Sequence, residues 1–153
     1  MPTPFHIALD RLAALVVAGA AHNYGLDTVP DSVNRAQLPA LLVLPGEPQE
    51  SRLFKDRAEG FHALAFGDGA RSVTYTVTHL LLVAPVAAGR GAQSHLPALI
   101  DLIDAYVATV AADVTLDGAL AEPMQVKIEP GTYKYGAVVY HGCAFRHTWR
   151  MDV

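Results

Sequence analysis

Residues 73–83 read VTYTVTHLLLV. In the first half of this segment, apolar or aromatic residues alternate with threonines, a pattern that predicts a strand with one covered and one exposed face. From His79 to Val83 both faces turn apolar, which is typical of a strand covered on both sides. We therefore expect a long strand in a sheet that carries a helix over part of its surface.

The segments on either side predict a hairpin before this strand and a helix after it. Phe61 to Phe66 forms a short strand, and Gly67-Asp68-Gly69 supplies the turn that reverses the chain. A glycine- and alanine-rich connection, residues 84–94, ends at Ser94, which suits a helix N-cap. The apolar residues that then recur on one helical face are Leu96, Leu99, Ile100, Ile103, Tyr106, Val107 and Val110.

The C-terminal part of the chain predicts three further strands. They are Pro123 to Ile128, Tyr133 to His141 and Cys143 to Met151, with turns at Glu129-Pro130-Gly131 and at Gly142. The last of these strands alternates bulky, largely apolar residues with polar ones. We expect one of its faces to be buried and the other to meet water.

The N-terminal part predicts a helix, a strand and a charged arm. The helix is indicated by the spacing of Phe5, Leu9, Leu12, Val16 and Ala20, and it stops at Asn23-Tyr24-Gly25. Residues 38–44 form a short apolar strand, and the charged arm from Glu47 to Gly60 offers a place for a partner contact. The whole pattern predicts one α+β domain over residues 1–153, a mainly antiparallel sheet with two amphipathic helices on one face.

The composition narrows the class of protein. Hydrophobic residues make up 52% of the chain and charged residues 17%, against about 25% charged in an average globular domain. So few charges predict that a partner covers part of the surface, although an ordinary monomer rich in alanine and valine has the same composition. The formal net charge of −4 does not favour nucleic acid.

Cysteine usage and hydropathy bear on the compartment. The single cysteine, Cys143, excludes an intrachain disulfide, and nothing indicates an oxidising compartment. The N-terminal residues lack the basic region of a signal peptide. No run of about 18 uncharged apolar residues is present to span a membrane. We expect a soluble chain that works inside a cell, or in a particle assembled inside one.

No residue pattern indicates catalysis, a metal site or a cofactor. His141 and His147 would face each other across the last expected turn, but no third or fourth metal ligand accompanies them. Cys143 alternates with aromatic residues on an apolar face, which favours a core residue over a nucleophile. Gly89-Arg90-Gly91 has only a bare G-x-G and neither phosphate-binding form. We expect a protein that is not an enzyme and binds no cofactor.

The polar face of the last expected strand carries Arg146 and Arg150, with Lys127 and Lys134 on neighbouring strands. These residues predict a modest basic patch, but the acidic net charge argues against recognition of nucleic acid by a single copy. In a ring, the repeated arginines would line or rim a pore.

Residues 132–153 read TYKYGAVVYHGCAFRHTWRMDV, in which Tyr140, Gly142 and Phe145 match the aromatic pattern Y-x-G-x-x-F. With an opening helix, a mid-chain hairpin with a long arm and a similar chain length, this block resembles the tail terminator and tail completion proteins of long-tailed bacteriophages. The resemblance extends over most of the chain in layout, and over Tyr133 to Met151 in residues.

The resemblance implies a structural role in a virion. It implies a homohexameric ring that caps the tail tube protein, ends its polymerisation and meets a head-side connector protein, while DNA only passes through the ring. The location implied is the head-proximal end of the tail, after assembly in the host cytoplasm. Residues expected to contact neighbouring copies or the tube are Glu47, Glu50, Arg52, Lys55, Asp56, Arg57, Arg90, Arg146 and Arg150. Two alternatives stay open: another head–tail connector or adaptor protein, or a small oligomeric bacterial binding protein.

Overall fold

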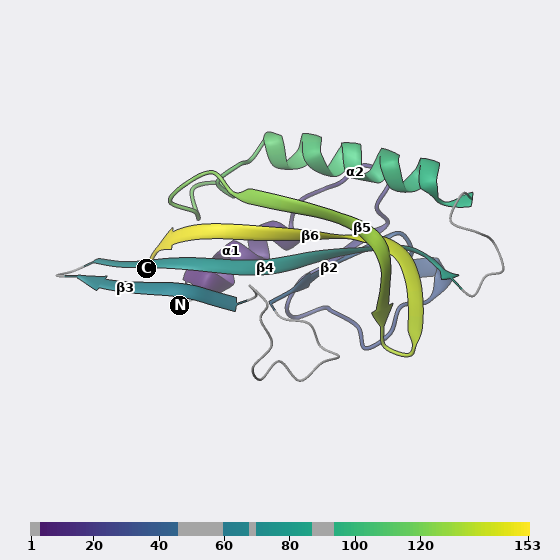
Figure 1. Ribbon diagram of the computed structural model, residues 1–153, viewed down its shortest axis with the longest axis horizontal. Coiled ribbons are helices and arrows are strands. Elements are labelled where there is room, and N and C mark those ends of the chain that lie inside the picture. The colour runs from purple at the N-terminus through teal and green to yellow at the C-terminus, as the bar shows by residue number, and fades with distance from the viewer. Residues whose placement is uncertain (1–3, 46–59, 68–69, 87–93) are drawn as a thin grey trace.

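The computed structural model describes residues 4–45, 60–67, 70–86 and 94–153 (Figure 1). The elements in chain order are α1 (Pro4–Ala13), β1 (His22–Tyr24), the short 3₁₀ helix η1 (Arg35–Gln37), β2 (Ala40–Leu44), β3 (Gly60–Gly67), β4 (Ala70–Pro85), α2 (Leu96–Ala111), β5 (Gln125–Tyr135) and β6 (Val138–Asp152).

The strands form one mixed sheet of six strands in the order β1-β2-β4-β6-β5, and β3 also pairs with β4. Every pairing is antiparallel except that of β1 with β2, which is parallel. β3 lies beside the first half of the long strand β4, and β2 lies beside its second half. The predicted α+β fold with a mainly antiparallel sheet is confirmed.

Both helices pack on the same face of the sheet, as the sequence predicted. α1 places Leu9 and Leu12 in a cluster that includes Trp149 of β6. α2 places Leu99 and Tyr106 in a second cluster, over Phe145 of the same strand. The buried residues that β4 and β6 contribute to these clusters all have odd numbers, because successive side chains of a strand point to opposite faces.

The opposite face of the sheet is covered at one end by residues 25–38. Val33 from this segment packs with Leu42, Leu80 and Tyr140, and the Tyr140 hydroxyl donates a 2.8 Å hydrogen bond to the Val33 carbonyl oxygen. The second half of β4 is therefore covered on both sides, as its apolar residues predicted. Toward the other end, this face carries threonines and arginines.

Two predicted turns do not exist. β5 continues through Glu129-Pro130-Gly131, and β6 continues through Gly142, so the chain makes two long strands here instead of three shorter ones. Pro130 is tolerated because β5 is an edge strand, where a missing N–H breaks no inner pairing. Gly142 marks a close approach of backbones: a Cβ atom there would lie 1.9 Å from the carbonyl oxygen of Leu81.

The reversal between these strands falls instead at Gly136, whose φ of 62° is in the left-handed region that favours glycine. As a consequence, His141 and His147 lie on the same strand and the same face. The prediction that they are cross-strand neighbours was wrong.

The helix boundaries also differ from the prediction. α1 ends at Ala13, so Val16 lies beyond the helix and is exposed. α2 begins at Leu96 and its N-cap is His95, which makes no capping hydrogen bond with its side chain; Ser94 is not the cap. On β4, Thr76 and Thr78 are buried, although the alternation predicted an exposed face.

Candidate functional site

Most of the residues predicted to contact a partner lie outside the described part of the chain. These are Glu47, Glu50, Arg52, Lys55, Asp56, Arg57 and Arg90. The structure places the remaining two, Arg146 and Arg150, on β6, on the sheet face opposite the helices.

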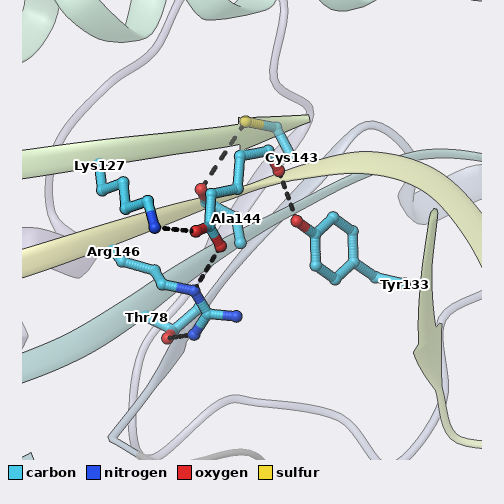
Figure 2. Close-up of polar contacts among 7 residues, drawn as sticks. Thr78, Lys127, Tyr133, Cys143, Ala144 and Arg146 are labelled. Carbon is cyan, nitrogen blue, oxygen red and sulfur yellow. Dashed lines mark hydrogen bonds and ion pairs between the residues drawn. The ribbon is translucent and has the colours of Figure 1, made fainter. Parts of the chain in front are cut away.

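Arg146 belongs to an ion-paired cluster that ties three strands together (Figure 2). Its Nε donates to Oε2 of Glu129 on β5 at 2.7 Å, and its Nη1 donates to Oγ1 of Thr78 on β4 at 3.1 Å. Lys127 pairs with the other carboxylate oxygen of Glu129 at 2.8 Å. Hydrogen bonds from Lys127 and Arg146 lower the pKa of the Glu129 carboxyl, so this carboxylate stays charged at neutral pH.

Three of the four cations of the predicted basic patch form ion pairs, with two carboxylates between them. Arg150 pairs with Glu122 at 3.0 Å on the exposed surface, and Lys127 and Arg146 share Glu129. A face whose cations are already paired attracts a polyanion weakly, because each new contact must replace an existing one. Most of the cations on this part of the sheet are therefore engaged in ion pairs.

α2 carries more apolar surface than the sheet covers. Leu96, Ile100 and Val107 have 47%, 52% and 47% of their surface exposed. With the half-buried Ile103 and Val110 they follow a 4-3-4-3 spacing, which places them along one line on the helix. We call these five residues the α2 stripe. The sequence predicted one broad apolar face for this helix. Only Leu99, Leu102 and Tyr106 on that face are fully buried, while Ile103 and Val110 pack against the edge of the core.

Among the described residues, the outer strands of the sheet lie on opposite sides of it. β5 is one outer strand, while β1 and β3 lie on the other side of β4 from β6 and β5 (Figure 1). Ile128, on the edge strand β5, is exposed. An open edge presents unpaired N–H and C=O groups that can pair with another chain.

A hydrogen-bonded row of side chains is buried between the sheet and the helices. We call it the polar row: Asn23, His79, Tyr106, His147 and Trp149. The Tyr106 hydroxyl lies 2.7 Å from Nδ1 of His79 and 2.5 Å from Nε2 of His147. At the two ends, Asn23 Oδ1 lies 2.8 Å from His79 Nε2, and Trp149 Nε1 donates to His147 Nδ1 at 3.4 Å.

The end at Asn23 determines the direction of every hydrogen bond in the polar row. The Asn23 side-chain NH₂ donates to the carbonyl oxygens of Leu12 and Leu15, both at 3.0 Å. Its Oδ1 must therefore accept from His79 Nε2–H, which leaves His79 Nδ1 to accept from the Tyr106 hydroxyl. The Tyr106 oxygen in turn accepts from His147 Nε2–H. The three inner groups, His79, Tyr106 and His147, each donate once and accept once along the row, so none of their polar atoms is left unpaired.

Burial keeps the polar row neutral. It lowers the pKa of His79 well below the usual value and lowers that of His147 to about 3. It also raises the pKa of the Tyr106 hydroxyl well above its usual value. The sequence contained a signal for this row, since His79 and His147 both occupy inward positions of strands, but it did not show that Tyr106 would join them.

Cys143 does not have the surroundings of a nucleophile. Its thiol is fully buried, and burial raises its pKa to about 11, so it is protonated at neutral pH. His147, which a catalytic pair would require as a base, is already hydrogen-bonded on both ring nitrogens. This geometry favours a core residue over a nucleophile at Cys143, as the alternation of the last strand predicted.

Two further groups of ligand-type side chains were not predicted. His6, Asp10 and Asp27 bring one potential ligand atom each within 4.8 Å of one another, and His6 Nε2 pairs with Asp10 at 3.3 Å. The imidazole rings of His95 and His141 lie with centroids 5.2 Å apart. His6 and Asp10 are neighbours on one turn of α1, but Asp27 joins them, and His141 joins His95, from distant parts of the sequence.

Comparison with known proteins adds no family to these observations. No protein-family model matches the chain, and no curated protein matches its sequence. Within the described residues, neither helix has the length and apolar character needed to cross a bilayer.

Proposed function

We propose that this chain is a tail terminator: its copies form a closed ring, a homohexamer, that caps a tail tube, ends tube polymerisation and joins the tube to a head-side connector. The observation that carries the proposal is the α2 stripe, a line of large apolar side chains of which three, Leu96, Ile100 and Val107, are about half exposed in a single copy. The aromatic block at residues 132–153 supplies the class of assembly by its resemblance.

The α2 stripe favours association because apolar surface left in water costs free energy. Burial is worth roughly 25 cal/mol per Å² of apolar surface, so covering several leucine, isoleucine and valine side chains supplies a few kcal/mol. Charged residues make up only 17% of the chain, which leaves other weakly polar surface available for contact. This surface supports self-contact more than contact with a charged ligand.

A ring also requires two different surfaces on each copy. The free edge of β5 and the edges of β1 and β3 lie on opposite sides of the sheet, so each copy has separate surfaces for two neighbours. Contacts of this head-to-tail kind close into a ring when the rotation between copies is a fraction of a full turn. The paired charges of Arg146 and Arg150 support passage of DNA rather than its binding.

Native mass spectrometry with two matched variants tests the assembly. We expect wild-type chain to form a single closed oligomer and Val107→Lys, which puts a charge into the α2 stripe, to shift it to monomers. Ala108→Lys, one position along on the exposed side of the same helix, should assemble like wild type. A wild-type chain that stays monomeric at high concentration and does not bind tail tubes would overturn the proposal.

An oligomeric bacterial binding protein would also appear as an oligomer in native mass spectrometry, but it would not control the length of tail tubes. Tail tube protein polymerised alone should give tubes of uncontrolled length, and addition of the wild-type chain should shorten them in electron micrographs. Val107→Lys should not shorten them. Oligomers that leave the tube length unchanged would favour the binding protein.

A further inference from the structure

We propose that His95 and His141 together bind one divalent transition-metal ion, Zn²⁺, Ni²⁺ or Cu²⁺, at the start of α2. His95 is the N-cap residue of that helix, and His141 lies on β6. Their ring planes are tilted by 32° and their centroids lie 5.2 Å apart. This site is independent of the proposed ring and does not involve the α2 stripe.

The Nε2 atoms of both histidines are buried and have no hydrogen-bond partner. In the described part of the chain, no other buried side-chain nitrogen or oxygen lacks a partner. Native proteins pair nearly all such atoms, and a buried exception calls for an explanation such as an ion. The polar row of the same fold shows the contrast, since both nitrogens of His79 and of His147 are paired there.

The ring separation fits two imidazoles that share one ion. With metal–nitrogen bonds of about 2.1 Å and a tetrahedral angle, two coordinated imidazole rings have centroids roughly 5 Å apart. The observed 5.2 Å matches this separation. Water molecules complete the coordination of an ion held by only two protein ligands.

The surroundings select the class of ion. Imidazole nitrogen suits zinc, copper and nickel, whereas calcium and magnesium prefer oxygen ligands. The positive end of the α2 dipole lies beside the pair and disfavours cations in general, so only ions with a strong preference for imidazole overcome it. The His6, Asp10 and Asp27 group has two carboxylates, is largely exposed and suits harder ions.

Calorimetric titration of the untagged full-length chain with zinc chloride tests the site. We expect one ion per chain, and His95→Leu or His141→Leu should each weaken binding at least about a hundredfold, since loss of an orienting partner alone costs roughly 10- to 100-fold. His6→Leu, which alters the other ligand group, should bind zinc like wild type. Without zinc, both leucine variants should melt at or above the wild-type temperature, because an unpaired buried nitrogen has been removed.

A second measurement covers the case in which a leucine variant does not fold. In nitrogen NMR spectra of the wild-type chain, zinc should move two imidazole Nε2 signals, those that His95→Asn and His141→Asn remove one at a time. Three results would overturn the proposal: zinc binding that survives when His95→Asn and His141→Asn are combined, zinc binding that depends on His6, or no binding of any of the three ions at millimolar concentration.

Discussion

At Tyr106, one hydroxyl group serves two buried histidines, donating to His79 and accepting from His147. Tyr106→Phe removes this group and leaves one nitrogen of each ring without a partner. We expect the free energy of unfolding to fall by about 2–4 kcal/mol, at roughly 1–3 kcal/mol for each buried unpaired group. Urea unfolding followed by circular dichroism measures this loss.

Tyr140→Phe is the matched control for that substitution. Tyr140 is also a buried residue, but its hydroxyl makes one hydrogen bond, to the Val33 carbonyl oxygen. Its removal should cost about 1 kcal/mol. Equal losses in the two variants would show that the polar row contributes no more than a single hydrogen bond.

The two histidines of the polar row also predict how stability depends on pH. The pKa of His79 is lowered by burial and that of His147 is lowered to about 3, so the folded chain excludes protons that the unfolded chain binds below about pH 6.5. Stability should fall as the pH falls, by roughly 1 kcal/mol per histidine between about pH 7.5 and 5.5. Urea unfolding at the two pH values tests the sign.

His147→Gln is the variant that assigns this pH dependence. Glutamine can donate to Tyr106 and accept from Trp149 but does not titrate. The loss of stability between the two pH values should therefore be about half that of wild type. A wild-type chain that is equally stable at both values would contradict the neutral, buried state of the histidines.

At the scale of the elements, Gly142 determines how closely β6 approaches β4. A side chain at this position meets the Leu81 carbonyl oxygen of β4, so Gly142→Ala should cost about 3 kcal/mol or more, or prevent folding. Gly131, the cross-strand partner on β5, has its nearest neighbouring atom at 3.9 Å, and Gly131→Ala should change stability by less than about 0.5 kcal/mol. Thermal unfolding of the two variants shows whether the loss of stability comes from the contact with the Leu81 carbonyl oxygen or from replacing any glycine in these strands.

The elements that the sequence predicted well are those whose pattern is local. The alternation over residues 73–83 indicated β4, and the helical spacing after Ser94 indicated α2, because these periods follow from the geometry of a strand and a helix. The turns at Glu129-Pro130-Gly131 and Gly142 were wrong because glycine and proline have two meanings in a strand. Either residue can mark a turn, but proline also occurs on an edge strand and glycine where two backbones approach closely. The position of the neighbouring strand, which the local sequence does not show, distinguishes these cases.

The candidate site was less predictable for the same reason. Spacing along α2 showed which residues are apolar but not how far the sheet would extend beneath them, so the α2 stripe was expected to be buried. His95 and His141, like the members of the polar row, meet only when distant parts of the chain have folded together. A single sequence does not show which distant residues come into contact in the folded chain.

For the whole molecule, the proposed assembly through the α2 stripe predicts a response to salt. Apolar contacts are not weakened by screening, whereas contacts between exposed charges are. Light scattering should therefore find the same oligomer in about 0.05 M and about 1 M sodium chloride. Dissociation at high salt would instead implicate charged residues, such as those predicted between Glu47 and Arg57.

The direction of the hydrogen bonds in the polar row limits what those groups can do. The Trp149 indole at one end can only donate, and the carbonyls of Leu12 and Leu15 at the other end can only accept. The row therefore has a single arrangement of its hydrogen bonds, and a proton that moved along it would leave a charge on a buried side chain. Histidines beside a tyrosine often suggest an acid–base mechanism. Here they instead join α1, α2 and the strands β1, β4 and β6 through one continuous chain of hydrogen bonds.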